Sequence, residues 1–232
     1  MGWHQELLIG FDLETTGTDP SASRIVTAAV LEVKEGVPIG RREWLADPGV
    51  PIPDEAAAIH GVTTERAAAE GRPAAEVVEE IARVLVGYWQ TGVPVVAYNA
   101  AFDLTMLAAE LRRYGLASLS ERLGGEVGPV LDPYTIDRAV DRYRKGKRTL
   151  EATCAVYGVA LDGAHEAGAD ALAAVRVACA VAERYEQVGG ADLWELHRSQ
   201  IGWYADWAAG YQQWLRKKGT PDAIVEARWP LR

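Results

Sequence analysis

The sequence predicts an α/β protein in which a mixed central sheet is flanked by helices. Three β-rich segments open the chain, and helical patterns then alternate with short apolar runs. The first segment, residues 7–17 (LLIGFDLETTG), has the apolar character of a buried central strand and ends in a Thr-Thr-Gly turn. Residues 24–34 and 37–45 are joined by Glu35-Gly36, which is a hairpin signal. We therefore expect an antiparallel three-stranded start to the sheet.

Helices and short strands alternate in the rest of the chain. Residues 74–89 carry apolar side chains at helical spacing, and Gly115 closes a second such pattern at 101–114. Between them, the apolar run at 94–98 (PVVAY) predicts a short buried strand. The other expected elements are a short helical piece within 56–65, a loop at 118–128, a strand at 130–131, and helices at 133–143, 149–159 and 167–186.

The composition indicates a globular chain with room for one core and a short appendage. No apolar run approaches the roughly 20 residues that a membrane-spanning helix needs. The N-terminus lacks the basic and long apolar regions of a secretory signal, so we expect a cytoplasmic protein with Cys154 and Cys179 reduced. The formal net charge of −9 argues against a protein that coats nucleic acid, but not against an enzyme whose site gathers metal ions.

Two carboxylates end the first strand. Because side chains alternate along a strand, Asp12 and Glu14 lie on the same face and point toward one spot. Their repulsion is relieved by a cation, and hard oxygen ligands favour Mg²⁺ or Mn²⁺. An ordinary strand that ends in an acidic, solvated turn explains these two residues equally well.

Further acidic residues and one histidine stand at the edges of later core elements. Asp103 lies in the first turn of the helix after the short strand, where the helix dipole alone favours a carboxylate. His165 precedes Asp170 by five residues, with the histidine in a loop and the aspartate at the start of a long helix. Four separated carboxylates and one histidine in such positions favour a shared site over four unrelated ones.

These motifs resemble those of the DEDDh group of 3′-to-5′ exonucleases, the DnaQ-like family. The segment 11–17 (FDLETTG) matches the first exonuclease motif, 99–103 (NAAFD) the second, and His165 with Asp170 the third. The resemblance covers roughly residues 5–186. Tyr98 is a small departure, because relatives often carry His before the Asn. The resemblance implies an RNase H-like exonuclease fold.

The resemblance also implies a mechanism and a set of binding residues. Asp12, Glu14 and Asp170 would hold one of two divalent ions, Mg²⁺ or Mn²⁺; Asp12 would bridge to the second ion and Asp103 would support it. His165 would act as general base, and water would release a nucleoside 5′-monophosphate from a single-stranded 3′ end. The nucleotide pocket and the flanks of the terminal bases would be formed by Leu13, Thr15, Thr16, His60 and Phe102.

The motifs are compatible with more than one kind of nucleic-acid substrate. DNA is the leading substrate, with a role in proofreading or repair. The runner-up is an RNA-trimming exoribonuclease similar to oligoribonuclease or RNase T, because the motifs read the 3′ end and not the sugar. The five intact motif residues disfavour a catalytically silent nucleic-acid binding module. The basic run 138–148 could steer the strand's backbone, although a charge run is usually a solvated face.

The C-terminal part differs in composition from the rest. We expect an exonuclease domain at 1–188 and a Trp-rich helical extension at 189–232. A helix over 191–218 would carry one broad apolar face that must be covered. Docking on the exonuclease domain is favoured over a polymerase, a repair partner or a second copy of the chain. The expected face consists of Leu193, Leu196, Tyr204, Trp207, Tyr211, Trp214 and Leu215.

Overall fold

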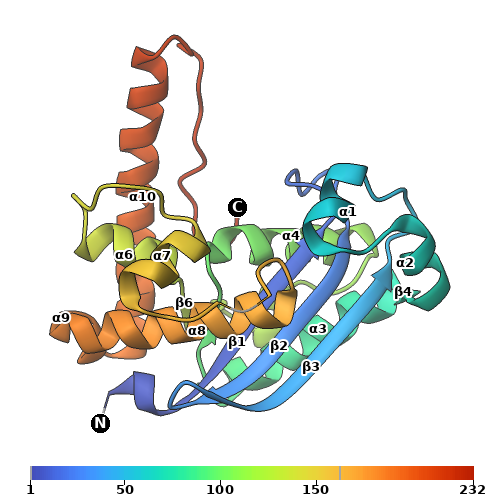
Figure 1. Cartoon of the computed structure of the whole chain (residues 1–232), viewed down its shortest axis with the longest axis horizontal. Coiled ribbons are helices and arrows are strands. Elements are labelled where there is room, and N and C mark those ends of the chain that lie inside the picture. Colours follow the sequence, from blue (N-terminus) through green and yellow to red (C-terminus); the bar gives the residue numbers. More distant parts are fainter. Residues whose placement is uncertain (1, 162) are drawn as a thin grey trace.

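The computed structural model describes residues 2–161 and 163–232, so positions 1 and 162 of the expected exonuclease domain lie outside the described residues (Figure 1). Within these ranges one mixed sheet contains six strands in the order β4-β3-β2-β1-β5-β6. β1, β2 and β3 are antiparallel neighbours as predicted, whereas β5 and β6 run parallel to β1. The strands are β1 (Leu7–Thr15), β2 (Ile25–Lys34), β3 (Val37–Asp47), β4 (Arg72–Pro73), β5 (Val95–Val96) and β6 (Val130–Leu131).

Helices cover both faces of the sheet, as the α/β prediction requires. α3 and α4 contribute to the core on one face, and α8 contributes to the core on the other. The fold therefore has the helix-sheet-helix layering of an RNase H-like exonuclease fold. The helical elements are η1 (Trp3–Gln5), α1 (Asp54–His60), α2 (Thr64–Glu70), α3 (Ala74–Gln90), α4 (Ala100–Arg113), α5 (Leu119–Leu123), α6 (Pro133–Val140), α7 (Leu150–Tyr157), α8 (Ala167–Arg184), α9 (Glu186–Gly189) and α10 (Leu193–Lys217).

Alternation along β1 decides which side chains face which helices. Ile9, Phe11 and Leu13 belong to the core beneath α3 and α4, while Leu8 belongs to the core beneath α8. Gly10 lies on the α8 side, where a Cβ atom would come within 2.8 Å of a backbone oxygen of α8. A glycine at this position therefore lets α8 lie close against β1, on the face that also carries the acidic residues.

Some local elements differ from the prediction. The expected loop at 118–128 contains α5, which begins with a capping box in which Ser118 and Glu121 satisfy each other's backbone groups. The helical piece near residue 60 is two helices, α1 and α2, separated by Gly61 in a left-handed conformation. The helix expected at 133–143 ends at Val140.

The C-terminal extension completes the edge of the sheet. β6 pairs with β5 on one side only, and side chains of α10 bond to the backbone at its other edge. There the Val130 N–H donates to His197 Nδ1 at 3.0 Å, and Gln200 Nε2 donates to the Val130 carbonyl at 3.0 Å. Gln200 Oε1 also accepts the Asp132 N–H at 2.7 Å. Two buried side chains of α10 thus satisfy backbone groups that a neighbouring strand would otherwise bind.

The apolar face of α10 is covered along only part of its length. Leu196 and Tyr204 are buried, and Tyr204 is part of the main core together with Trp229. Beyond that point the helix projects away from the sheet (Figure 1), and Tyr211 and Trp214 are 41% and 51% exposed. Docking on the rest of the described chain therefore covers the first part of this face. Near its end, the segment after α10 bonds to Gln212 through the Val225 N–H, but Tyr211 and Trp214 stay exposed.

Two further expectations concern the cysteines and the membrane. Cys154 is buried and Cys179 is half-buried, and both are free thiols. Among the helices of the described chain, none combines the length and apolar character needed to cross a membrane.

Candidate active site

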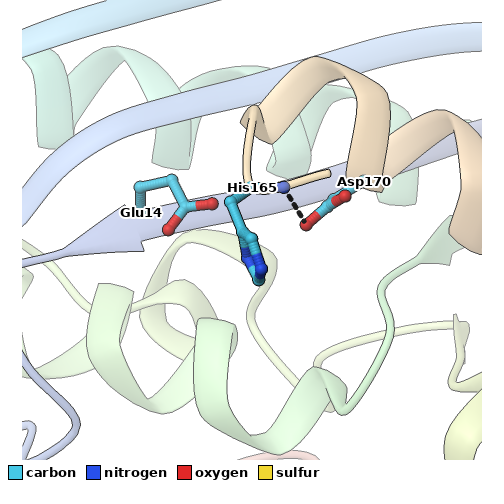
Figure 2. A group of neighbouring side chains, drawn as sticks. All are labelled: Glu14, His165 and Asp170. Carbon is cyan, nitrogen blue, oxygen red and sulfur yellow. Dashed lines mark hydrogen bonds between the residues drawn. The ribbon is translucent and has the colours of Figure 1, made fainter. Parts of the chain in front are cut away.

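Three side chains from two parts of the fold meet at the end of β1. Glu14 lies near the end of this strand, His165 lies in the loop before α8, and Asp170 lies in the first turn of α8 (Figure 2). One ligand atom from each lies within 4.8 Å of the others. His165 adopts a left-handed backbone conformation with φ of 68°, and its N–H donates to Asp170 Oδ2 at 3.3 Å. The loop is thereby fastened to the helix that carries the aspartate.

Asp12 and Asp103 complete an acidic cluster at the same place. The Leu13 N–H donates to Asp103 Oδ1 at 3.1 Å, which joins the first turn of α4 to the backbone of β1 between the two strand carboxylates. Asp103 is 3% exposed. The charges of Asp103, Asp170 and Glu14 all act on Asp12. The fold therefore brings together all five residues predicted to be catalytic.

The cluster favours protonated carboxyls when no cation is bound. Burial, followed by repulsion from neighbouring carboxylates, raises the pKa of Asp12 well above its usual value. Burial also raises the pKa of Asp103 and of Asp170. Burial and the Asp170 charge together raise the pKa of Glu14 to about 7. Four carboxyls that resist ionisation in one place are typical of a site built to bind positive charge.

The donor set fits a divalent metal ion. Asp170 Oδ1 is buried and has no hydrogen-bond partner in the described chain, so a ligating atom is left free beside Glu14 and His165. Carboxylate oxygens are the ligands that Mg²⁺ and Mn²⁺ prefer. A bound cation would satisfy the orphaned oxygen and relieve the repulsion between the carboxylates.

The predicted nucleotide-pocket residues on β1 are held by local structure. Leu13 has its side chain in the core and is 5% exposed, so only its backbone can face a ligand. The Thr15 hydroxyl donates to the Gly17 carbonyl at 2.7 Å, and the Thr16 hydroxyl accepts the Arg24 N–H at 2.9 Å. These bonds fix the Thr-Thr-Gly turn in front of the acidic cluster. A role for the three residues in nucleotide binding remains a prediction.

The two residues predicted to flank the terminal bases occupy different surroundings. His60 and His165 both line a cavity of about 450 Å³. His60 Nε2 is buried without a partner among the described residues, and burial lowers the pKa of this imidazole. Phe102 is half-buried and packs against the main core at the start of α4. His60 is therefore placed next to the acidic site, whereas Phe102 serves core packing at least in part.

Sequence reasoning missed a buried carboxyl behind the second motif. Asp132, directly after β6, is fully buried, and burial raises its pKa. Its Oδ1 accepts the N–H of Asn99, which has a left-handed φ of 62° at the start of α4. Its Oδ2 accepts from Thr135 and, at 3.4 Å, from Trp229 of the C-terminal segment. The Asp-Pro pair at 132–133 signals a helix start, but nothing local in the sequence indicates these distant partners.

The comparison with known families agrees with this site. The family model described as "Exonuclease" matches residues 9–178, which include all three motifs. The chain belongs to this exonuclease family and is a nuclease. Its motifs and relatives place it in the DnaQ-like, DEDDh group of 3′-to-5′ exonucleases, whose members depend on divalent metal ions.

Individual relatives match only part of their own length. The PolC-type DNA polymerase III of Halalkalibacterium halodurans is 30% identical over 161 residues, which are 69% of this chain and 10% of that protein. E. coli exonuclease I in complex with a dT13 oligonucleotide has a TM-score of 0.66 and 22% identity, covering 79% of this chain and 42% of that one. Exonuclease I from Methylocaldum szegediense has a TM-score of 0.62 and 27% identity, covering 80% and 42%. The chain thus spans about a tenth of its curated relatives and less than half of these solved structures.

Proposed function

We propose that this protein is a metal-dependent 3′-to-5′ exonuclease that removes nucleotides from the 3′ end of single-stranded DNA. The observation that carries the proposal is the meeting of Glu14, His165 and Asp170 within 4.8 Å, with one aspartate oxygen left unpartnered. The reaction is hydrolysis of the terminal phosphodiester, which releases a nucleoside 5′-monophosphate and a shortened strand with a new 3′-hydroxyl.

The acidic residues would hold two divalent ions, Mg²⁺ or Mn²⁺. Asp12, Glu14 and Asp170 would hold the first ion, and Asp12 and Asp103 would contribute to holding the second. Ions bound there would stabilise negative charge on the attacking and leaving oxygens of an in-line displacement. Asp103 has a further task of its own, because its bond to the Leu13 N–H holds the β1 backbone in place between the two strand carboxylates.

His165 is the proposed general base. Imidazole ordinarily titrates near neutral pH, so it can take the proton of the attacking water and later return it to solvent. The side chain is exposed in a loop, while its backbone is tied to Asp170. This arrangement leaves the ring free to turn toward a substrate while its Cα stays close to the acidic cluster.

The preference for DNA is supported by the neighbours rather than by a contact within this chain. E. coli exonuclease I has been solved with dT13, and the PolC-type relatives are DNA polymerases. We therefore place the activity in DNA proofreading or repair in the cytoplasm, with a polymerase or repair protein as the expected partner.

Matched DNA and RNA oligomers with a 5′ label test the proposal. With Mg²⁺ or Mn²⁺ we expect a ladder of DNA products shortened from the 3′ end and mononucleotide release, both abolished by a chelator. Faster digestion of the RNA oligomer would replace the DNA assignment by the exoribonuclease alternative. Full activity in excess chelator, or none on either oligomer with both metals, would contradict the metal-dependent nuclease itself.

A further inference from the structure

A continuous line of aromatic rings and one guanidinium leads from the second motif to α10. Tyr98 follows β5 and directly precedes this motif, and its ring centre lies 5.5 Å from that of Tyr134 in α6. The guanidinium of Arg138 lies 4.5 Å from the Tyr134 ring centre and 3.8 Å from that of Trp207. One end of the line therefore lies beside the candidate active site, and the other reaches the C-terminal helix.

The line continues along α10 as a stack. Trp207 and Tyr211 have ring centres 5.4 Å apart, Tyr211 and Trp214 have centres 5.7 Å apart, and both pairs are tilted by only 13°. Tyr211 and Trp214 are the exposed members described above. The stack borders a cavity of about 470 Å³ between α6 and α10, which we name the α6–α10 groove and define by Arg138, Arg142, Arg148, Trp203, Trp207 and Tyr211.

The charged residues that line the groove are Arg138, Arg142, Arg144, Arg148 and Asp206, so its lining is mainly positive in a chain whose net charge is −9. Arg148 is paired with the buried Asp137, but among the described residues Arg138 and Arg142 have no carboxylate within ion-pair distance. The same is true of Lys145 and Lys147 in the adjoining loop. The basic run at 138–148 therefore contains two kinds of cation. Arg144 and Arg148 pair with the buried Asp137 and hold the fold together, whereas Arg142, Lys145 and Lys147 are exposed and available to a ligand.

We propose that the α6–α10 groove binds the stretch of single-stranded nucleic acid that lies upstream of the 3′ end held at the active site. The proposal rests on the proposed function for the direction of the strand. Unpaired guanidinium and ammonium groups match phosphates, and exposed rings match bases, which stack on aromatic side chains without regard to sequence. An apolar protein helix would leave these cations buried and unpaired, and an acidic peptide would leave the stacked rings unused.

Binding of oligothymidylates in a chelator tests the groove without hydrolysis. The full chain with Arg142→Glu and Trp214→Ala is compared with the wild type on a trinucleotide and on an oligomer of about 20 nucleotides, since single-strand sites typically cover roughly 4 to 16. We expect the variant to bind the long oligomer at least about 10-fold more weakly and the trinucleotide within about twofold of the wild type. The slope of log affinity against log salt should fall by about 0.7 for each cation removed.

Lys34→Glu provides the matched charge control. Lys34 is exposed and pairs with Leu7, at the end of β1 away from the acidic cluster, so this variant should bind both oligomers like the wild type. Equal affinity of groove variant and wild type for the long oligomer would overturn the proposal, and so would an equal loss on both lengths. Tighter binding of an oligoglutamate peptide than of the oligonucleotide would assign the groove to an acidic protein segment instead. Because hydrolysis is absent from the assay, an inactive enzyme with groove-dependent binding would refute the proposed function alone.

Discussion

Replacing Gln200 by Leu should destabilise the protein through the edge of β6. The side chain is fully buried, accepts the Asp132 N–H and donates to the Val130 carbonyl. Leucine has a similar volume but no polar atoms, so both backbone groups lose their partner inside the protein. Each unsatisfied buried group costs about 1–3 kcal/mol, which gives a loss of about 2–6 kcal/mol in the free energy of unfolding. A typical domain has only about 5–15 kcal/mol in total.

Urea or thermal unfolding measures this loss, with Gln213→Leu as the control. Gln213 lies on the same helix but is exposed, so the same substitution should change stability by no more than about 0.5 kcal/mol. For a chain of this size, each kcal/mol lowers the melting temperature by about 2–4 °C. Equal stability of the two variants would show that α10 does not support β6 and would refute the reasoning.

Three further predictions concern the acidic cluster. Asp12→Ala should abolish exonuclease activity. It should also raise the melting temperature of the metal-free protein, because it removes one of four carboxylates that repel each other. A lower melting temperature of the variant in chelator would contradict this repulsion. His165→Ala should lower turnover by roughly 10² to 10⁴ while metal binding measured by calorimetry survives, and wild-type turnover would exclude the general base. The raised pKa of Glu14 stabilises the metal-free fold below pH 4.5, and this contribution is lost as the pH rises through about 7. Glu14→Gln should therefore gain stability relative to the wild type over that pH range. If the melting temperatures of the two proteins differed by the same amount at every pH, the raised pKa of Glu14 would be contradicted.

The sequence predicts the framework from short-range patterns, whereas the five-residue cluster is predicted from its match to the motifs of a known family. The apolar run of β1 and its period of two place Asp12 and Glu14 on one face, and this face is the one that meets α8. The closeness of Asp170 could not be predicted in the same way, because it depends on how near α8 lies to Gly10. The missed helix α5 did have a local signal, since Ser118 and Glu121 form a capping box.

The C-terminal extension marks the limit of sequence reasoning. A helical wheel identifies an apolar face that includes Trp214, but only the lengths of the neighbouring elements decide how far along the helix this face is covered. The buried role of Gln200 is equally invisible, because an isolated glutamine in a helix usually faces solvent. Its partners Val130 and Asp132 lie 70 and 68 positions away in the sequence.

The capped edge of β6 has a consequence for how the chain can be divided. Cutting after Val188 would follow the expected domain boundary. It would leave the outward-facing backbone groups of Val130 and Asp132 free to pair with a strand of another molecule. Copies of the fragment would then associate through this strand edge. The fragment would lose solubility although all its catalytic groups are still present. A nuclease module taken from this chain for fusion to another protein should therefore include α10 and the segment that follows it as far as Trp229, because α10 prevents a further strand from adding to the sheet.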